Sequence, residues 1–159
     1  MSNDKHLRLD DQLCFALYAA TNAVTRSYAP LLKAIDLTYP QYLVMLVLWQ
    51  DGASTSGSIA RRLKLAPHSI TPLLDKLERA GFVERQRDQA DRRVVHVLLS
   101  ERGRALESAA ADAQSVVECQ TGLDDVTLPA LREELMRLVN RMEAEDETQA
   151  NAVQTPETV

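Results

Sequence analysis

The chain has 159 residues, which is enough for one domain or for one domain with long dimerising arms. Acidic residues outnumber basic ones by 23 to 18, for a formal net charge of −5, while 45% of the residues are hydrophobic and only 4% aromatic. This composition is typical of a folded, mostly helical protein. No apolar run reaches the roughly 18 residues of a membrane span, which excludes a transmembrane protein. The first residues also lack the apolar stretch of a signal peptide, so we expect a cytoplasmic protein.

The two cysteines and three histidines are scattered and do not have the spacing of metal ligands. The sequence therefore predicts no metal site and no cofactor. In a reducing cytoplasm, Cys14 and Cys119 are expected to be thiols by default.

A long helix is predicted near the N-terminus, with Asp10 or Asp11 as its cap. Its apolar stripe follows a repeat close to 3.5 residues and comprises Leu13, Leu17, Ala20, Val24 and Leu31. Pro30 interrupts the stripe and predicts a kink there. The stripe is longer than the core of one helix-turn-helix needs, so we assign residues 1–36 to a dimerisation helix. Burial within the monomer is the alternative.

The next helix is predicted over Pro40–Gln50 and is apolar nearly all round, so we expect it at the centre of the core. Thr38 as the cap, proline in the first turn and Gln41 three residues after the cap form a helix start. Gly52 is predicted to follow its end.

The middle of the chain has the pattern of a helix, a turn, a second helix and a hairpin with a basic tip. The first helix is predicted over Ser56–Leu63, and the second has one apolar face and is stopped by Gly81. The segments Phe82–Arg87 and Val94–Leu99 are predicted strands around a polar turn. We therefore predict a mostly α fold with a small β-hairpin wing. In this winged helix-turn-helix, residues 37–100, the second helix enters the DNA major groove.

The segment from Arg61 to Arg104 is basic within an acidic chain, because it holds eleven Lys and Arg residues against six Asp and Glu. A local excess of five positive charges is typical of a face that binds the phosphates of DNA. An ordinary solvated surface is the alternative. Because charge and motif coincide, we expect double-stranded operator DNA as a partner.

Two further helices are predicted after the wing. Ser100 caps the first, which runs to about Gln120, and Thr127 caps the second. The second has a seam at three- and four-residue steps, formed by Leu128, Leu131, Leu135, Leu138 and Met142. We assign residues 101–145 to C-terminal dimerisation helices and expect a homodimer. The polar residues 146–159 have no apolar pattern and are predicted to be a disordered tail.

The start of the second helix of the motif is where base contacts are expected. Proline deep in a helix costs about 3 kcal/mol but little in the first turn, so the cheaper arrangement has its cap near Ser69 and Pro72 in the first turn. His68, Ser69, Thr71 and Pro72 then face the groove. The hydroxyls can bond base edges or phosphates, and the proline ring can touch a thymine methyl. The alternative is that these residues only cap the helix.

In the wing, Asp91 stands two residues before Arg93. A carboxylate at a tight turn can hold the guanidinium extended, in a form suited to a narrow minor groove. An ordinary surface salt bridge is the alternative. We assign Lys76, Arg85 and Arg87 to phosphate contacts rather than to base readout.

Asp91-x-Arg93, followed by Val97-x-Leu99-Ser100-x-x-Gly103, resembles the wing signature of the MarR family of dimeric winged-helix regulators. Thr71-Pro72-Leu73-Leu74 is similar to the recognition helix of one branch, the OhrR-type organic-hydroperoxide sensors. That branch carries a reactive cysteine early in its first helix and tyrosines further along. The resemblance places these on Cys14, Tyr18, Tyr28 and Tyr39, and Cys119 matches the second cysteine of the two-cysteine subclass.

Cys14 is predicted in or just after the first turn of the first helix, where the helix dipole favours a thiolate. The acidic pair just before it opposes this, so the direction of the pKa shift stays open. Tyr18 lies one turn on, but Tyr28 is roughly 21 Å away along a straight helix. Tyr28 cannot reach Cys14 of its own chain unless the helix folds back, whereas an antiparallel partner arm could bring it near. We therefore expect a sensor pocket across the dimer, with Tyr28 and Tyr39 from the other subunit. A buried structural cysteine is the alternative.

The resemblance implies a redox-sensing repressor. The reduced dimer binds a near-palindromic operator, and an organic hydroperoxide oxidises Cys14 to sulfenic acid. Cys119 of the partner subunit then forms an intersubunit disulfide with it, which releases the DNA. Two other hypotheses stay open: a regulator that binds a small aromatic acid between its arms, and a thiol peroxidase enzyme. The first predicts that Cys14→Ser leaves induction intact, and the second requires neither Asp91 nor Arg93.

Overall fold

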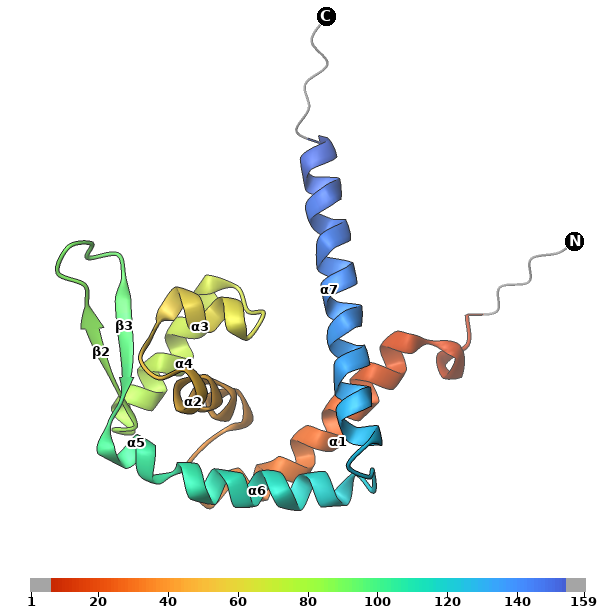
Figure 1. Ribbon diagram of the computed structural model, residues 1–159, viewed down its shortest axis with the longest axis horizontal. Helices are drawn as coiled ribbons and strands as arrows, with labels where there is room; N and C mark the ends of the chain where they lie inside the picture. The colour runs from red at the N-terminus through yellow and green to blue at the C-terminus, as the bar shows by residue number, and fades with distance from the viewer. Residues whose placement is uncertain (1–6, 154–159) are drawn as a thin grey trace, which may run out of the picture. The chain divides into compact units, whose positions relative to one another are not determined.

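The computed structural model describes residues 7–153 and shows a mostly helical chain with a small wing, as predicted (Figure 1). The chain divides into two compact units between Val117 and Glu118. The first unit holds α1 (Leu13–Lys33), α2 (Tyr39–Asp51), β1 (Ser54–Thr55), α3 (Ser56–Arg62), α4 (Pro67–Arg79), β2 (Val83–Arg87), β3 (Val95–Leu99), α5 (Glu101–Ala105) and most of α6 (Glu107–Gln120). The second holds the end of α6 and α7 (Thr127–Val153).

The sheet of the first unit is antiparallel, with strand order β1-β3-β2. β2 and β3 form the wing, with Val83 opposite Leu99 at its base. Both predicted wing strands are confirmed to within one residue. β1, where Ser54 pairs with Val97, is absent from the sequence prediction. A strand of two residues is too short to show the alternation of apolar and polar residues, so β1 is defined only by its pairing with β3.

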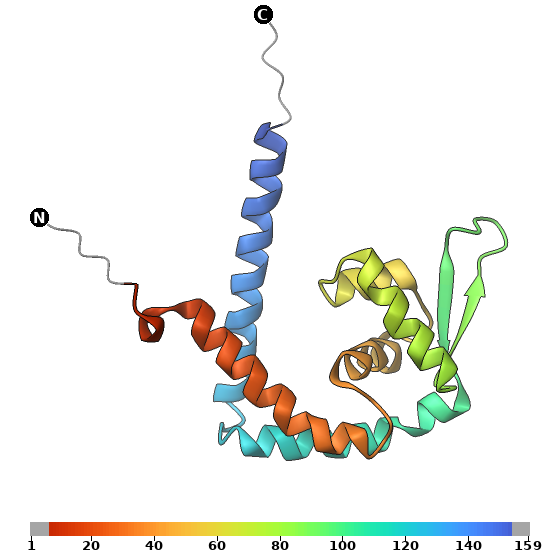
Figure 2. The same ribbon diagram turned by 180° about the vertical axis from the view of Figure 1, so that it is seen from behind.

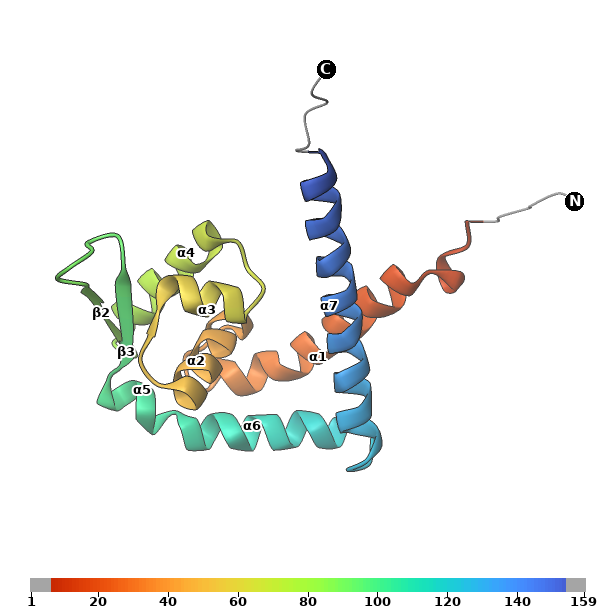
Figure 3. The same ribbon diagram turned by 45° about the horizontal axis from the view of Figure 1, so that its top comes forward.

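Helix α2 lies between the α3–α4 pair and α6, at the centre of the first unit (Figures 1 and 3). Its start is the predicted one, because Thr38 N donates to Gln41 Oε1 at 2.9 Å and the Thr38 side chain accepts from the backbone N–H of that residue. Val44, Met45 and Leu48 of α2 are at most 1% exposed. The same core cluster continues through Ile59, Ile70, Leu74, Leu77, Phe82 and Val97.

The start of α1 differs from the prediction. Leu9–Asp11 form a separate 3-10 turn, and Gln12 is the residue before the helix, so neither Asp10 nor Asp11 caps α1. The reason is local: the Gln12 N–H donates to Leu9 O at 3.1 Å and closes a turn that contains both aspartates. Cys14 is then the second residue of α1, inside the first turn as predicted.

The apolar stripe of α1 is largely exposed. Leu13 is 60% and Val24 36% exposed, while Tyr28 and Leu32 are the buried residues of this helix. Burial of the whole stripe within the monomer is therefore wrong. The helix continues through Pro30 as one element.

Helix α4 begins earlier than predicted. Pro67 occupies its first position, where a missing N–H costs nothing, so the cap expected near Ser69 is wrong. Pro72 lies inside the helix, where its ring removes the N–H that would donate to the His68 carbonyl. Three buried side chains on the opposite face of α4 offset that cost.

The turn from α4 into the wing follows the prediction at Gly81, which has φ +77°. Its N–H donates to Glu78 O at 2.9 Å, and the Phe82 N–H donates to Leu77 O at 3.0 Å. These two bonds define a Schellman motif, which needs the left-handed conformation that glycine adopts without strain.

After the wing, Ser100 is the predicted cap, since its Oγ accepts from Gly103 N at 3.0 Å. The single helix expected as far as Gln120 is instead divided into α5 and α6 at Leu106. That residue keeps near-helical angles of φ −75° and ψ −17°.

The second unit corrects two predictions. Asp124, not Thr127, caps α7, because Asp124 Oδ1 accepts from Thr127 N at 2.7 Å. The helix continues to Val153, so the disordered tail predicted from Asp146 is wrong up to that residue. Four of the eight residues from Asp146 to Val153 are Glu, Gln or Ala, which favour helix without any apolar stripe. The remaining tail, 154–159, lies outside the described residues, among which no helix is long and apolar enough to cross a membrane.

Candidate DNA interface and thiol sites

Helix α4 presents one face to the core and another to solvent. Its outward side chains are the ones predicted to meet DNA: Ser69 is half-buried, and the exposed ones are His68, Thr71, Pro72 and Lys76. Ser69 is the third residue of the helix and not its cap, so the interpretation that these residues only cap the helix is wrong. The outward face places hydroxyl, imidazole and ammonium groups on one surface.

Asp91 and Arg93 make the expected contact, which is also the one that an ordinary surface salt bridge makes. Asp91 Oδ1 accepts from Arg93 N at 3.0 Å and from Arg93 Nε at 3.3 Å. The Arg93 side chain is nevertheless 92% exposed. The carboxylate thus steers the guanidinium at its Nε and leaves the terminal nitrogens to a ligand.

Asp88 organises the wing turn, a role that the sequence analysis missed. Its Oδ1 accepts from Ala90 N at 2.8 Å and from Asp91 N at 3.0 Å, while Oδ2 lies 2.9 Å from His96 Nε2. The N–H of Asp91, then His96 and the N–H of Ala90, lower the pKa of Asp88 to about 2 by hydrogen bonding. The available signal was an aspartate at the first position of a polar turn, where its side chain bonds the backbone ahead.

The predicted phosphate partners differ in their surroundings. Arg87 is exposed and donates from Nη1 to Arg92 O at 3.2 Å within the wing. Arg85 instead forms ion pairs with two carboxylates of α4, Asp75 and Glu78, each at 2.7 Å. The guanidinium of Arg85 is committed within the protein, which argues against its predicted phosphate contact.

The two cysteines are exposed thiols, so the interpretation of Cys14 as a buried structural residue is wrong. Tyr18, one helical turn beyond Cys14, is 67% exposed. Cys119 is the last residue but one of α6. Cys14 belongs to the first compact unit and Cys119 to the second. Within the described part of the chain, no cluster of three or more His, Cys, Asp or Glu side chains could hold a metal ion.

Tyr28 and Tyr39 are brought together, with Tyr42 as a third member that the sequence analysis missed. The Tyr28 ring centroid lies 5.5 Å from that of Tyr39 and 5.2 Å from that of Tyr42. Burial raises the pKa of Tyr39, and the neighbouring Tyr28 adds to the effect. This cluster lies where α1 packs on the start of α2, whereas Cys14 and Tyr18 belong to the first two turns of α1. Figure 2 shows that the first turns of α1, in red, lie at the end of the helix away from α2. The structure therefore joins two of the predicted sensor tyrosines and separates both from Cys14.

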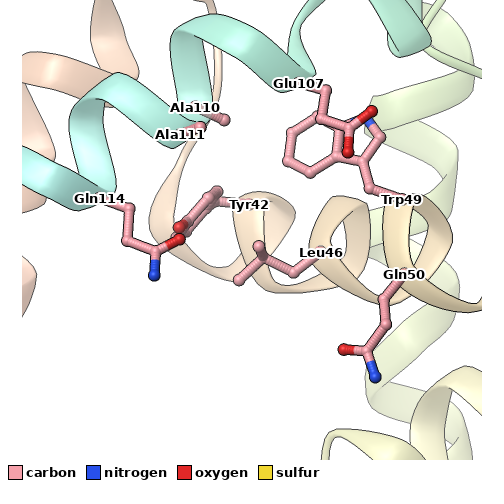
Figure 4. A pocket seen from close by; sticks show the side chains of 8 residues that line it. All are labelled: Tyr42, Leu46, Trp49, Gln50, Glu107, Ala110, Ala111 and Gln114. Carbon is pink, nitrogen blue, oxygen red and sulfur yellow. The ribbon is translucent and has the colours of Figure 1, made fainter.

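Two cavities open beside these tyrosines. A cavity of about 550 Å³ is lined by Thr25, Ala29, Lys33, Asp36, Leu37, Thr38, Tyr39 and Pro40. A smaller one, of about 200 Å³, lies between α2 and α6, where Tyr42, Leu46, Trp49 and Gln50 face Glu107, Ala110, Ala111 and Gln114 (Figure 4). The larger cavity carries a lysine and an aspartate, and the charged residue of the smaller one is Glu107.

Similar proteins share this architecture. The family model described as MarR family matches residues 37–95. The HTH-type transcriptional regulator TtmR of Methylorubrum extorquens (strain PA1) is 42% identical over 147 residues, which cover 92% of this chain and 72% of TtmR. The organic hydroperoxide resistance transcriptional regulator of Bacillus subtilis (strain 168) is 38% identical over 112 residues, which cover 70% of this chain and 76% of that regulator.

Among solved structures, AbfR of Staphylococcus epidermidis is similar in its reduced, overoxidized and disulfide-formed states. Reduced AbfR bound to DNA has a TM-score of 0.72 and 34% identity, covering 85% of this chain and 94% of AbfR. Disulfide-formed AbfR has a TM-score of 0.61 and 33% identity, covering 88% of this chain and 93% of AbfR. With these relatives and the winged fold, the chain belongs to the MarR family of transcriptional regulators.

Proposed function

We propose that this chain is a dimeric repressor that releases operator DNA when an organic hydroperoxide oxidises Cys14. The observation that carries the proposal is an exposed thiol in the first turn of α1, in a chain 38% identical to an organic hydroperoxide resistance regulator. An exposed thiol at this position is accessible to a peroxide.

For DNA binding, we assign α4 to the major groove and the wing to the minor groove and its phosphates. The proposed contacts from α4 are His68, Ser69, Thr71, Pro72 and Lys76. From the wing, Arg93, steered by Asp91, enters the minor groove, and Arg87 meets a phosphate. The similarity to AbfR, which has been solved on DNA, supports this assignment.

Dimerisation is proposed to use the arms outside the winged helix, residues 1–36 and 101–145. Apolar side chains remain exposed on both. They include Leu13, Phe15, Tyr18 and Val24 on α1, and Leu131, Leu135, Met136 and Met142 on α7. Burial of these side chains against a second copy would remove apolar surface from water, which favours association. A two-fold dimer places two recognition helices on two half-sites.

The proposed chemistry balances without a further reactant. The Cys14 thiolate attacks the distal peroxide oxygen, the O–O bond breaks, and the alkoxide takes a proton to leave as an alcohol. Cys14 becomes a sulfenic acid. The thiolate of Cys119 of the partner subunit then attacks that sulfur, an S–S bond forms, and hydroxide leaves and is protonated to water.

Disulfide formation is proposed to move the two recognition helices out of alignment with the two DNA half-sites. A disulfide requires about 4.4–6.8 Å between its two Cα atoms, so a thiol pair held farther apart in the DNA-bound state must move before it closes. Half-sites lie about 34–36 Å apart, and a shift of a few ångströms between recognition helices misplaces them. A similar protein, AbfR, has been solved in a disulfide-formed state, which supports the proposal.

The experiment compares operator affinity before and after one equivalent of cumene hydroperoxide, at one fixed salt concentration. The probe is a duplex that the reduced wild-type protein selects from a random-sequence library. Wild type should lose affinity by roughly 5- to 150-fold, the usual range for coupled sites. Cys14→Ser should bind equally well before and after peroxide.

Cys119→Ser separates the two chemical steps and serves as the matched control. It should consume one equivalent of peroxide, yet show no dimer-sized band on a non-reducing gel. If peroxide releases DNA from Cys14→Ser as it does from the wild type, the redox proposal is wrong. Turnover of many peroxide equivalents without specific DNA binding would instead favour the thiol peroxidase.

A second candidate function, response to a small aromatic acid, is favoured by one cavity. Lys33, Asp36 and Tyr39 line the 550 Å³ cavity, where the Lys33 ammonium can pair with a carboxylate and a ring can pack on the tyrosine, although Asp36 opposes an acid. The 200 Å³ cavity does not suit this ligand, because its lining includes Glu107 and neither Lys nor Arg. Salicylate that releases DNA from Cys14→Ser but not from Lys33→Met would support this function over the redox one.

A further inference from the structure

Arg85 joins the recognition helix to the wing through a dense set of bonds. From β2, its Nη1 contacts Asp75 Oδ1 at 2.7 Å, and its Nη2 and Nε contact Glu78 Oε2 at 2.7 Å and 3.0 Å. The other Glu78 oxygen, Oε1, accepts from the backbone N of Arg85 at 3.1 Å. Both carboxylates belong to α4. One arginine therefore ties two positions of the helix to one position of the strand.

The electrostatics of this cluster are unsuited to a phosphate. One positive and two negative groups leave it with a net negative charge. Hydrogen bonds from the Arg85 side chain hold the pKa of Glu78 below its usual value, so Glu78 stays ionised at neutral pH. The Arg85 side chain is 26% exposed, against 92% for Arg93. Long-range attraction to DNA is therefore left to the other basic residues of the segment.

The cluster forms a second connection between α4 and the wing. A short turn separates the end of α4 from the strand that follows, and the Schellman bonds at Gly81 and Phe82 fix that turn. A single turn still allows the β2–β3 hairpin to rotate relative to α4. Arg85 closes a second connection, seven residues after Glu78 and directly opposite Val97 of β3. With two connections between α4 and β2, this rotation is restricted.

We propose that Arg85 is a positioning residue, a brace that presets the angle between the recognition helix and the wing. The inference rests on the proposed DNA-binding function. Major-groove and minor-groove contacts must be made at once, so a protein that samples other angles binds in only a fraction of its conformations. Its apparent affinity equals the affinity of the correctly angled conformation multiplied by the fraction of molecules in that conformation. The brace raises affinity without touching DNA.

The discriminating variant is Arg85→Lys, compared with Arg87→Lys two residues along the same strand. Lysine serves a phosphate well as a point charge, but it cannot reproduce a planar fork across two carboxylates. We therefore expect Arg85→Lys to lose roughly tenfold in affinity for the selected duplex, the scale of one coupled pair. We expect Arg87→Lys to lose less affinity than Arg85→Lys, because lysine still serves a phosphate as a point charge. Equal, near-wild-type binding by both variants would overturn the brace.

Salt dependence gives an independent reading. Removing a phosphate contact lowers the slope of log K against log salt by about one, so Arg87→Met should show that change. Arg85→Met should weaken binding with its slope unchanged, and Glu78→Gln/Arg85→Met should bind no more weakly than Arg85→Met. A reduced slope for Arg85→Met would make Arg85 a phosphate contact and end the proposal.

A scrambled duplex separates positioning from folding. Arg85→Lys should keep its affinity for the scrambled duplex and lose its preference for the selected one. Loss of binding to both duplexes, with a lowered melting temperature, would show that Arg85 serves the fold and would overturn the inference. Failure of the wild-type protein to prefer any duplex would instead contradict the proposed function itself.

Discussion

The indole Nε1 of Trp49 donates a hydrogen bond to the carbonyl oxygen of Gly103 at 3.0 Å, joining α2 to α5. Gly103 is buried, and a Cβ built on it overlaps the Phe82 carbonyl oxygen. Leu99 Cδ2 would lie 3.3 Å away. The glycine is required by the close approach of two backbones, where α5 crosses the base of the wing.

Gly103→Ala should therefore destabilise the fold. The added methyl has to displace backbone, which costs about 1–3 kcal/mol of unfolding free energy, the range for overpacked sites. Urea unfolding at one fixed protein concentration measures the change, since a dimer's stability depends on concentration. Gly57→Ala is the matched control, because its Cβ meets nothing within 4 Å and alanine favours the helix. Equal stability of the two variants would contradict the packing argument.

Most of the fold could be predicted because its signals are local. The Thr38–Gln41 capping box, the Ser100 cap and the Gly81 stop each depend on a few adjacent residues, and all three are confirmed. The errors arise where two local signals compete. Pro67 and Pro72 both suit a first turn, and only the buried face of α4 decides between them.

The wing should be sensitive to acid through Asp88. The pKa of Asp88 in the folded protein is about 2, below the ordinary 3.8. The ionised carboxylate therefore stabilises the folded wing fully above pH 3.8, and this stabilisation is lost as the pH falls through 2 and the carboxylate is protonated. NMR titration of the Asp88 carboxyl carbon should give a midpoint near 2. The amides of Ala90 and Asp91 should shift with the same midpoint. Asp88→Asn should abolish that titration, and a midpoint near 3.8 in the wild type would refute the turn's hydrogen bonding.

Asp91 should assist DNA binding although it is negatively charged. It steers Arg93 through a contact of 3.3 Å to Nε, so Asp91→Ala leaves a charged but unguided guanidinium. We expect Asp91→Ala to weaken operator binding by a few-fold, and to have no such effect when Arg93 is already alanine. A double-mutant cycle in fluorescence anisotropy tests this coupling. Tighter binding by Asp91→Ala would show simple charge repulsion instead.

The candidate site was only partly predictable, because ion pairs depend on tertiary placement. Asp91 and Arg93 are two residues apart, and their contact could be predicted from the turn. Arg85 reaches Asp75 ten residues earlier, across a helix end and a glycine turn. From sequence, Arg85 is indistinguishable from Arg87. Tyr42 was missed for the same reason, since its apolar neighbours on α2 hide an aromatic cluster that only packing against α1 creates.

The proposed sensor site should need both subunits. In one chain, Tyr28 packs on Tyr39 and Tyr42, and fourteen residues of α1, roughly 21 Å, separate it from Cys14. If Tyr28 serves the partner's Cys14, a mixed dimer of a Cys14→Ser chain and a Tyr28→Phe chain contains one intact site. That site should react with cumene hydroperoxide at the wild-type rate. The measurement is the rate of sulfenic acid formation in purified, differently tagged heterodimers.

The matched control combines both substitutions on one chain and pairs it with wild type. Its remaining Cys14 then faces a partner subunit that carries Tyr28→Phe, so it should react more slowly, by roughly fivefold if a hydrogen bond of about 1 kcal/mol is lost. A site formed within one chain predicts the reverse order, because the wild-type chain of the control would hold an intact site. The ranking of these two heterodimers thus decides which subunit supplies the tyrosine, whatever the absolute rates are.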